Sequence, residues 1–314
     1  MHFESRVFKL PKDSDHPEQD QDACQIDGQR GIAVIADGVS SGIFSRQWAD
    51  ILTKAVVADL PDPDKTEHFA RWLTLRREAW AAEVDVSQLA WHQKPRLRQG
   101  AFSTLLWVRL VPDQANPEPD SWLLDAFALG DSCLFHVRQG QLLSCFPIQS
   151  AAELEANPLV VGSVDLNRDH LLRFRRFSQP CLEDDLVVLC TDAVAEWALR
   201  LAESGQPPNW EDYWGFGEEA WRQQIAALRE ARQMRVDDAT LALLRVVRRL
   251  PAPRGDCSSP SAQKGESAGV AEQLNATVKA VSEHLASRFG QAVRKLKEVS
   301  ESAGSALRKR LDKH

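Results

Sequence analysis

The chain alternates between short apolar runs and longer segments in which apolar residues recur at helical spacing. Residues 31–36 form an apolar run that ends at Asp37-Gly38, which is typical of a buried strand running into a turn. Steps of three and four between apolar residues predict two long helices, over 43–59 and 66–83. Further strands are predicted over 101–110, 122–129, 132–138, 141–146, 171–177, 185–190 and 239–247.

Strands and helices fall into separate blocks along the chain. Helices are predicted over 193–204 and 217–233, between the last strands, and the turn Arg138-Gln139-Gly140 favours a hairpin. Runs of consecutive strands with helices in separate blocks indicate an α+β layered fold.

A segment rich in Pro, Gly and Ser divides the chain at residues 251–269. Such a composition does not build a core and prefers extended, solvated backbone. We therefore expect a folded body over 1–249, a flexible linker over 250–269 and a separate tail over 270–314.

The tail, residues 270–314, is predicted to be an amphipathic helix with an excess of basic residues. Gly290 and Gly304 lie inside it, and each weakens the neighbouring turn by about 1 kcal/mol relative to Ala. The apolar stripe of such a helix must be buried against another surface. Self-association, packing on the body and contact with an anionic membrane surface all remain open.

Composition narrows the class of protein. The 314 residues are 43% hydrophobic and 26% charged, as in an ordinary globular protein. No apolar run reaches the roughly 18 residues of a membrane span. The formal net charge of −7 argues against a dedicated nucleic-acid binder. The polar N-terminus does not resemble an export signal, so a cytoplasmic location is expected.

The most informative polar residues are aspartates at the ends of predicted apolar strands. Asp37 ends one strand, Asp131 lies between two others, and Asp192 ends a further one. Asp237-Asp238 opens the last strand. Each alone is typical of a turn or a helix cap. Together they would repel one another unless cations compensate them, and oxygen ligands without a spaced set of His or Cys favour Mg²⁺ or Mn²⁺.

Six short blocks extend this pattern over residues 20–245. In chain order they are Gln21-Asp22-Ala23, Ala36-Asp37-Gly38-Val39, Gly100-Ala101-Phe102-Ser103-Thr104, Gly130-Asp131-Ser132, Thr191-Asp192-Ala193 and Asp237-Asp238-Ala239-Thr240. The series resembles the motifs of the bacterial-type type 2C metal-dependent serine/threonine protein phosphatases, the PPM family. This resemblance implies an α+β fold with a central β-sandwich of two antiparallel sheets flanked by helix pairs, to which the C-terminal amphipathic helix is added.

The resemblance also implies a centre of two Mg²⁺ or Mn²⁺ ions at one end of the sandwich. Asp37 would bridge the two ions, and Gly38 would offer its backbone carbonyl to one of them. Asp192 and Asp237 would bind the other ion. Asp37 and Asp192 are therefore the residues on which catalysis is expected to depend most.

Two further aspartates receive roles from the same resemblance. Asp22 would hold metal-bound water, and Asp131 would join Asp192 in binding a third ion, as in bacterial members. Asp238 would orient its neighbour instead of binding metal. Two cations about 3.5 to 4 Å apart lower the pKa of a bridging water, so that hydroxide can attack phosphorus in line without a covalent phosphoenzyme.

Some parts of the family pattern are missing. The arginine that grips the substrate phosphate, just upstream of the first acidic block, has no counterpart in residues 15–20. Arg6, Lys12 or a residue from a loop could replace it. No histidine follows Gly38 to act as the leaving-group acid of the eukaryotic pattern.

Two functions follow. The first is a metal-dependent protein serine/threonine phosphatase that uses metal-activated water on a phosphorylated protein substrate. The alternative is a pseudophosphatase, a binding module that docks to a partner or a membrane through residues 270–314.

Overall fold

The structure is a computed structural model that describes residues 1–85, 94–116, 121–154, 158–165 and 173–248. The predicted linker, 250–269, and the predicted helical tail, 270–314, lie outside these ranges. The strands are β1 (His2–Leu10), β2 (Asp22–Asp27), β3 (Ile32–Asp37), β4 (Phe102–Ser103), β5 (Leu105–Pro112), β6 (Trp122–Leu129), β7 (Cys133–Arg138), β8 (Gln141–Phe146), β9 (Val161–Gly162), β10 (Arg175–Cys181), β11 (Leu186–Cys190) and β12 (Ala239–Val247). The helices are α1 (Ser45–Asp59), α2 (Thr66–Glu83), α3 (Lys94–Leu97), α4 (Asp192–Glu203), α5 (Trp210–Trp214) and α6 (Glu218–Glu230).

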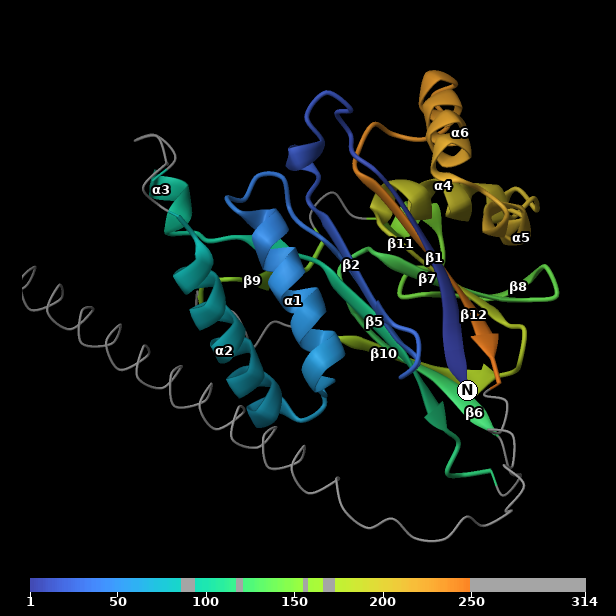
Figure 1. Ribbon diagram of the computed structural model, residues 1–314, viewed down its shortest axis with the longest axis horizontal. Helices are drawn as coiled ribbons and strands as arrows, with labels where there is room; N and C mark the ends of the chain where they lie inside the picture. Colours follow the sequence, from blue (N-terminus) through green and yellow to red (C-terminus); the bar gives the residue numbers. More distant parts are fainter. Residues whose placement is uncertain (86–93, 117–120, 155–157, 166–172, 249–314) are drawn as a thin grey trace, which may run out of the picture. The chain divides into compact units, whose positions relative to one another are not determined.

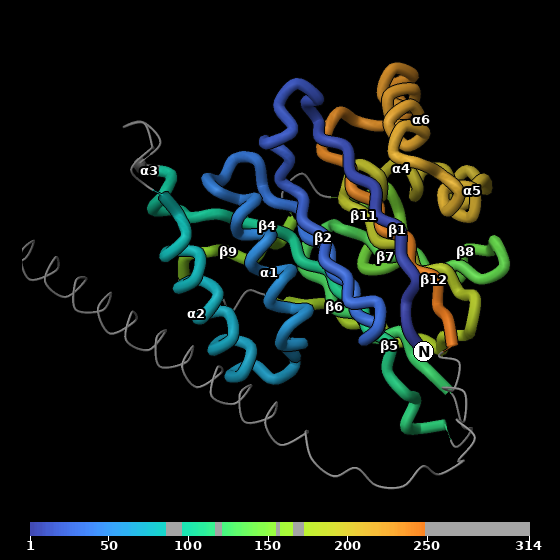
Figure 2. Tube along the Cα trace, in the orientation of Figure 1, coloured from blue at the N-terminus to red at the C-terminus, as the bar shows by residue number. Residues whose placement is uncertain are grey.

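Two five-stranded antiparallel sheets form the centre of the domain. Sheet I has the strand order β1-β12-β11-β7-β8, and sheet II has the order β10-β6-β5-β3-β2. Helices α1 and α2 cover the outer face of sheet II, and α4, α5 and α6 lie on the other side, over sheet I (Figures 1 and 2). The predicted α+β sandwich is therefore confirmed, with three helices instead of a pair over sheet I.

Alternation along the strands produces the layers. In β3, Ile32 and Val34 pack under α1 and α2, whereas Ala33 and Ile35 enter the core between the sheets. In β11, Leu186 and Val188 face the helices over sheet I, while Val187 and Leu189 face sheet II. Because both faces of each central strand are buried, these strands read as continuous apolar runs.

The strand ends that carry the aspartates meet at one end of the sandwich. In sheet II, Asp22 at the start of β2 is the register partner of Asp37 at the end of β3. In sheet I, Cys190 at the end of β11 pairs with Cys133 at the start of β7 and with Leu241 near the start of β12. Asp131, Asp192 and Asp237-Asp238 therefore adjoin the same end, which we call the acidic end.

None of the helices in the described residues is both long and apolar enough to span a membrane.

Candidate metal centre

Asp37 is fixed by its backbone. Its N–H donates to Thr104 Oγ1 at 2.9 Å, and its carbonyl oxygen accepts from Thr104 N and Ser103 Oγ, both at 2.9 Å. Thr104 Oγ1 is also 2.9 Å from Ser132 Oγ. These bonds hold the backbone where β3 ends and leave the carboxyl group at the acidic end.

Gly38, the residue after β3, lies very close to neighbouring backbone. Its N–H donates to Gln21 O at 3.2 Å, and it bridges to Ser103 across the ladder. A Cβ at this position would lie 2.8 Å from Gln21 O and 3.0 Å from the backbone of Ser45. Only glycine lets the β3 end pass so close to its neighbours.

Asp22 connects the two sheets. Its Oδ2 accepts hydrogen bonds from Thr191 Oγ1 at 2.9 Å and from Thr240 Oγ1 at 2.7 Å, and both threonines belong to sheet I or its edge. Its Oδ1 is buried and accepts no hydrogen bond from any residue that the structure describes. Burial raises the pKa of Asp22 to about 7, against the Thr240 hydrogen bond, and the charges of Asp20 and Asp238 add to the rise.

Asp37 lies in a still more acidic environment. Burial raises its pKa well above the ordinary value, and the nearby charges of Asp22, Asp131, Asp237 and Asp238 raise it further. Four carboxylates thus act on a fifth at short range. Of the residues predicted for the site, Asp22, Asp131 and Asp237 are thus near Asp37.

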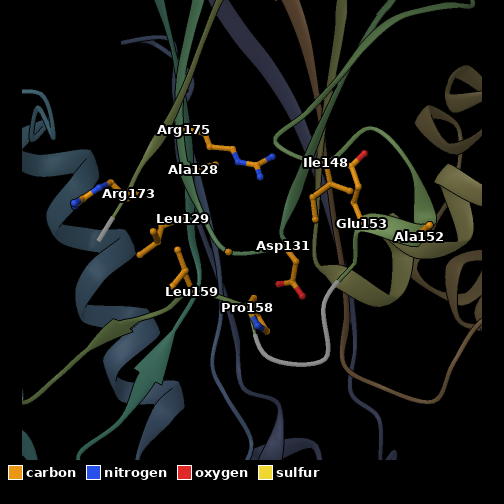
Figure 3. Close-up of a pocket in the computed structure, with 11 residues that line it drawn as sticks. Ala128, Leu129, Asp131, Ile148, Ala152, Glu153, Pro158, Leu159, Arg173 and Arg175 are labelled. Carbon is orange, nitrogen blue, oxygen red and sulfur yellow. The ribbon is translucent and has the colours of Figure 1, made fainter. Parts of the chain in front are cut away.

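Asp131 lines a cavity of about 250 Å³ at the acidic end. The cavity lies between the end of β6 and the segment after β8, and its walls include Ile148, Glu153 and Arg175. Figure 3 shows the Arg175 side chain directed toward Ile148, with Asp131 and Pro158 next to each other. The Arg175 guanidinium donates to Pro147 O at 2.7 Å.

Asp192 and Asp237 contact a guanidinium group. Arg235 Nη2 forms an ion pair with Asp192 Oδ2, and Arg235 Nε lies 3.9 Å from Asp237 Oδ2. Arg235 Nη1 is 3.5 Å from Glu196 Oε2. Asp192 Oδ1 is buried and has no hydrogen-bond partner among the described residues. Sequence reasoning missed Arg235, although it lies only two residues before Asp237.

Asp238 holds the loop between β1 and β2. Its Oδ1 accepts from Lys12 N at 2.7 Å and its Oδ2 from Gln21 N at 2.9 Å. Both carboxylate oxygens therefore accept hydrogen bonds from backbone N–H groups at the two ends of the loop before Asp22, and the expected orientation of its neighbour by Asp238 stays a prediction. Asp20, which sequence reasoning also missed, contacts Lys9 Nζ at 2.6 Å and supplies Asp22 N with an acceptor at 3.0 Å.

The two basic residues suggested for the substrate phosphate have different positions. Arg6 Nη1 donates to Phe216 O at 3.3 Å, and its guanidinium lies over the Trp214 ring. Lys12 Nζ donates to Ser40 Oγ at 2.9 Å, two residues after Gly38. Of the two, Lys12 is the one beside the acidic end.

The donor chemistry of the acidic end fits a divalent cation. Buried carboxylate oxygens without a donor, at Asp22 and Asp192, and the mutual repulsion around Asp37 are what a hard cation would relieve. With the side chains as they stand, no three His, Cys, Asp or Glu residues in the described part of the chain come together closely enough to hold one ion. Asp22, Asp37 and Gly38 lie at the strand ends of sheet II, whereas Asp192 and Asp237 lie beside those of sheet I, where Arg235 contacts both.

Comparison with known proteins identifies a family that the chain matches. The family model described as protein phosphatase 2C matches residues 12–240. No curated protein matches the chain significantly.

Several solved structures resemble the domain. The serine/threonine phosphatase PstP/Ppp of Mycobacterium tuberculosis is 16% identical, with 79% of this chain and 100% of that chain covered and a TM-score of 0.49. Stp1 of Staphylococcus aureus is 12% identical, with coverages of 78% and 96% and a TM-score of 0.49. PppA of Pseudomonas aeruginosa is 17% identical, with coverages of 78% and 98% and a TM-score of 0.47.

Proposed function

The chain belongs to the protein phosphatase 2C family, and from this premise we propose that it hydrolyses phosphoserine and phosphothreonine in protein substrates with Mg²⁺ or Mn²⁺. One observation carries the proposal: aspartates from both sheets converge at one end of the sandwich, and buried oxygens of Asp22 and Asp192 lack a donor among the residues described. A bound cation would offset the charge of carboxylates so placed, which otherwise take up protons at a higher pH than usual.

Each residue of the acidic end has a distinct part in this function. Asp37 would contribute the central carboxylate and Gly38 its carbonyl oxygen, while Asp192 and Asp237 would serve a second ion and Asp131 a third. Divalent ions held there supply hydroxide near neutral pH and offset the charge of the phosphoryl oxygens. Asp22 keeps its Oδ2 on Thr191 and Thr240, so that only its Oδ1 is left to orient water.

Lys12 completes the proposal as the contact for the substrate phosphate. Its ammonium group lies beside Ser40, at the mouth of the acidic end, where a phosphate would need a cation to approach several carboxylates. The cavity beside Asp131 and Arg175 would then receive side chains of the substrate that flank the phosphorylated residue.

The first test is hydrolysis of p-nitrophenyl phosphate and of a phosphothreonine peptide by the full chain, with Mn²⁺ and with chelator. We expect turnover that requires the metal, and its loss in Asp37→Asn and in Asp192→Asn, with the melting temperature of the domain retained. Asp64→Asn serves as the matched control, because Asp64 pairs with Arg176 outside the acidic end. Full activity in either of the first two variants would contradict the site assignment.

A second function is favoured by one observation. Arg235 contacts Asp192 and Asp237, the two carboxylates that a second ion would need. A chain in which this contact were permanent would be a pseudophosphatase, which binds phosphoproteins without hydrolysing them and docks to a partner or membrane through 270–314. Tight binding of the phosphothreonine peptide without any metal-dependent turnover would select this alternative. A cytoplasmic location is part of the same proposal in either case.

A further inference from the structure

We propose that Arg235 is a built-in cation of the metal centre, and that it must leave Asp192 and Asp237 before these carboxylates bind a metal ion. The inference rests on the proposed function, because it concerns how the same site is regulated. It assigns to Arg235 a control over metal affinity that is separate from the binding of substrate.

The contacts of Arg235 define the position. Three of its guanidinium nitrogens each approach a different carboxylate: Nη2 meets Asp192, Nη1 lies 3.5 Å from Glu196, and Nε lies 3.9 Å from Asp237. A planar guanidinium with several fixed donors suits such a set of acceptors. The guanidinium group therefore compensates the negative charge of these three carboxylates, as a bound cation would.

Neighbouring arginines do not share this position. Arg229 donates to the backbone oxygens of Pro11 and Asp237, so that it joins segments of the chain. Arg200 pairs with Glu196 one turn along α4 but has no contact with Asp192 or Asp237. Among the cations that the structure describes here, Arg235 is the one whose charge is directed at both predicted metal ligands.

Arg235 also has a partly exposed side chain. Its side chain is 39% exposed, and it lies in the segment between α6 and β12, where the next residue, Val236, is 68% exposed. The guanidinium can therefore swing into solvent without opening the core. What it gives up on leaving are ion pairs to partly buried carboxylates, which a divalent cation replaces with stronger coordination.

The energetic consequence is a competition. A metal ion binds Asp192 and Asp237 only in the fraction of molecules from which Arg235 has withdrawn, and the apparent affinity is reduced by that fraction. The other half of the centre, around Asp37 and Gly38, has no such competitor in its described contacts. Occupancy of the second position would thus require a higher metal concentration than occupancy of the first.

The test is calorimetric titration of the full chain with Mn²⁺, without substrate. We compare wild type with Arg235→Gln, which removes the charge and keeps a shorter polar side chain, and with Arg235→Lys. Arg200→Ala is the matched control, because it removes an equal charge from the same Glu196. We expect the weakest Mn²⁺ site of Arg235→Gln to tighten by about tenfold or more, Arg235→Lys to lie between, and Arg200→Ala to resemble wild type.

Thermal unfolding gives a second readout. Without metal, Arg235→Gln should melt below wild type, because its carboxylates repel one another. With saturating Mn²⁺ the variant should gain more in melting temperature than wild type gains. If the variant is too unstable to titrate, Arg235→Lys provides the same comparison with the charge kept but the fork of donors removed.

The outcomes separate the two proposals. Equal Mn²⁺ affinity in wild type and Arg235→Gln, together with turnover, overturns the competition and leaves the phosphatase intact. Tighter Mn²⁺ binding by the variant without turnover in any protein supports the competition and removes the phosphatase. Failure of Mn²⁺ to bind either protein overturns both.

Discussion

Asp22 and Asp185 are buried aspartates of the same domain whose neighbours move the carboxyl pKa in opposite directions. Burial raises the pKa of Asp22 to about 7, and one oxygen has no donor among the described residues. Burial alone would also raise the pKa of Asp185, but hydrogen bonds from Arg138, His136 and the Leu182 N–H outweigh it and lower the pKa to about 2. The Asp185 carboxylate therefore finds its hydrogen-bond partners within the protein. Asp22 keeps one buried oxygen without a donor among the described residues, as expected of a group that contacts a ligand.

This contrast predicts how stability depends on pH at Asp185. Because its folded pKa lies below the ordinary 3.8, its contribution is present above pH 3.8 and disappears as the pH falls through about 2. Asp185→Asn should lower the free energy of unfolding at pH 7 by about 2 kcal/mol. Urea unfolding at several pH values would show this gap closing between pH 4 and 2. A gap that stays constant down to pH 2 would mean that the Arg138 and His136 contacts do not stabilise the carboxylate.

Lys12 gives a prediction about substrate. If its ammonium contacts the phosphate, Lys12→Ala should raise KM for a phosphopeptide by about tenfold, the worth of one charge-assisted hydrogen bond, and change kcat little. Arg6→Ala is the control, since Arg6 binds Phe216 O and lies over Trp214. Steady-state kinetics with Mn²⁺ would measure KM for both variants. A larger rise in KM from Arg6→Ala than from Lys12→Ala would identify Arg6 as the phosphate contact instead.

At the scale of residues, the sequence predicted the site residues that directly follow an apolar strand. Asp37 and Asp192 were found because each follows an apolar run, and the structure places both where β3 and β11 end. Arg235 was missed because a charge pair between a turn and a helix leaves no periodic signal. Its only sequence signal was a cation next to Asp237 in an otherwise acidic block.

At the scale of elements, the turn from β6 to β7 depends on Gly130. Its φ of +103° lies in a region that side chains avoid, and a Cβ there would come within 2.6 Å of Thr104 Cγ2. Thr104 in turn accepts the hydrogen bond from Asp37 N. Strain at this turn is therefore transmitted to the backbone of Asp37.

We predict that Gly130→Ala lowers the free energy of unfolding by about 1–3 kcal/mol and also weakens Mn²⁺ binding. Gly140→Ala is the matched control, because Gly140 has a φ of +75° but no atom within 4 Å of the place that a Cβ would take. It should cost only about 1 kcal/mol and leave metal binding unchanged. Denaturant unfolding and Mn²⁺ titration measure the two effects, and equal losses in both variants would show that the Thr104 contact has no influence.

Some elements could not be read from the sequence. Strand β1 was missed because its middle, Glu4–Val7, is exposed and breaks the alternation, and it forms through pairing with β12. The predicted strand over 171–177 is observed as β10, four residues later at its start, and residues 166–172 lie outside the described ranges. The predicted strand over 101–110 is divided into β4 and β5 at Thr104, where the backbone turns to bind Asp37.

At the scale of the whole molecule, periodicity predicted helices and strands but not which sheet each strand joins. Sheet I unites β1 with β12, from opposite ends of the described chain, and no local pattern encodes such a pairing. The family resemblance supplied the sandwich that the strand blocks left open. The assignment of 1–249, 250–269 and 270–314 to separate regions stays a prediction.

That prediction is testable by truncation. A chain that ends at Leu250 should keep its Mn²⁺-dependent turnover and melting temperature, because all of the strands and helices described here precede that residue. If 270–314 mediates self-association, light scattering should show a smaller particle after truncation, and if it binds anionic membranes, vesicle sedimentation should be lost. A marked fall in the melting temperature would mean that the tail belongs to the folded domain.

The two hydrogen bonds that Asp22 accepts from Thr191 and Thr240 have a consequence for the evolution of this chain. One carboxylate group sets the spacing of the two layers where they meet, so lengthening or shortening that side chain shifts a whole layer. Substitutions at these three positions are then tolerated only when they occur in concert. Relatives that have exchanged one member of the trio should carry a compensating exchange at another, a correlation that an alignment of such chains would display.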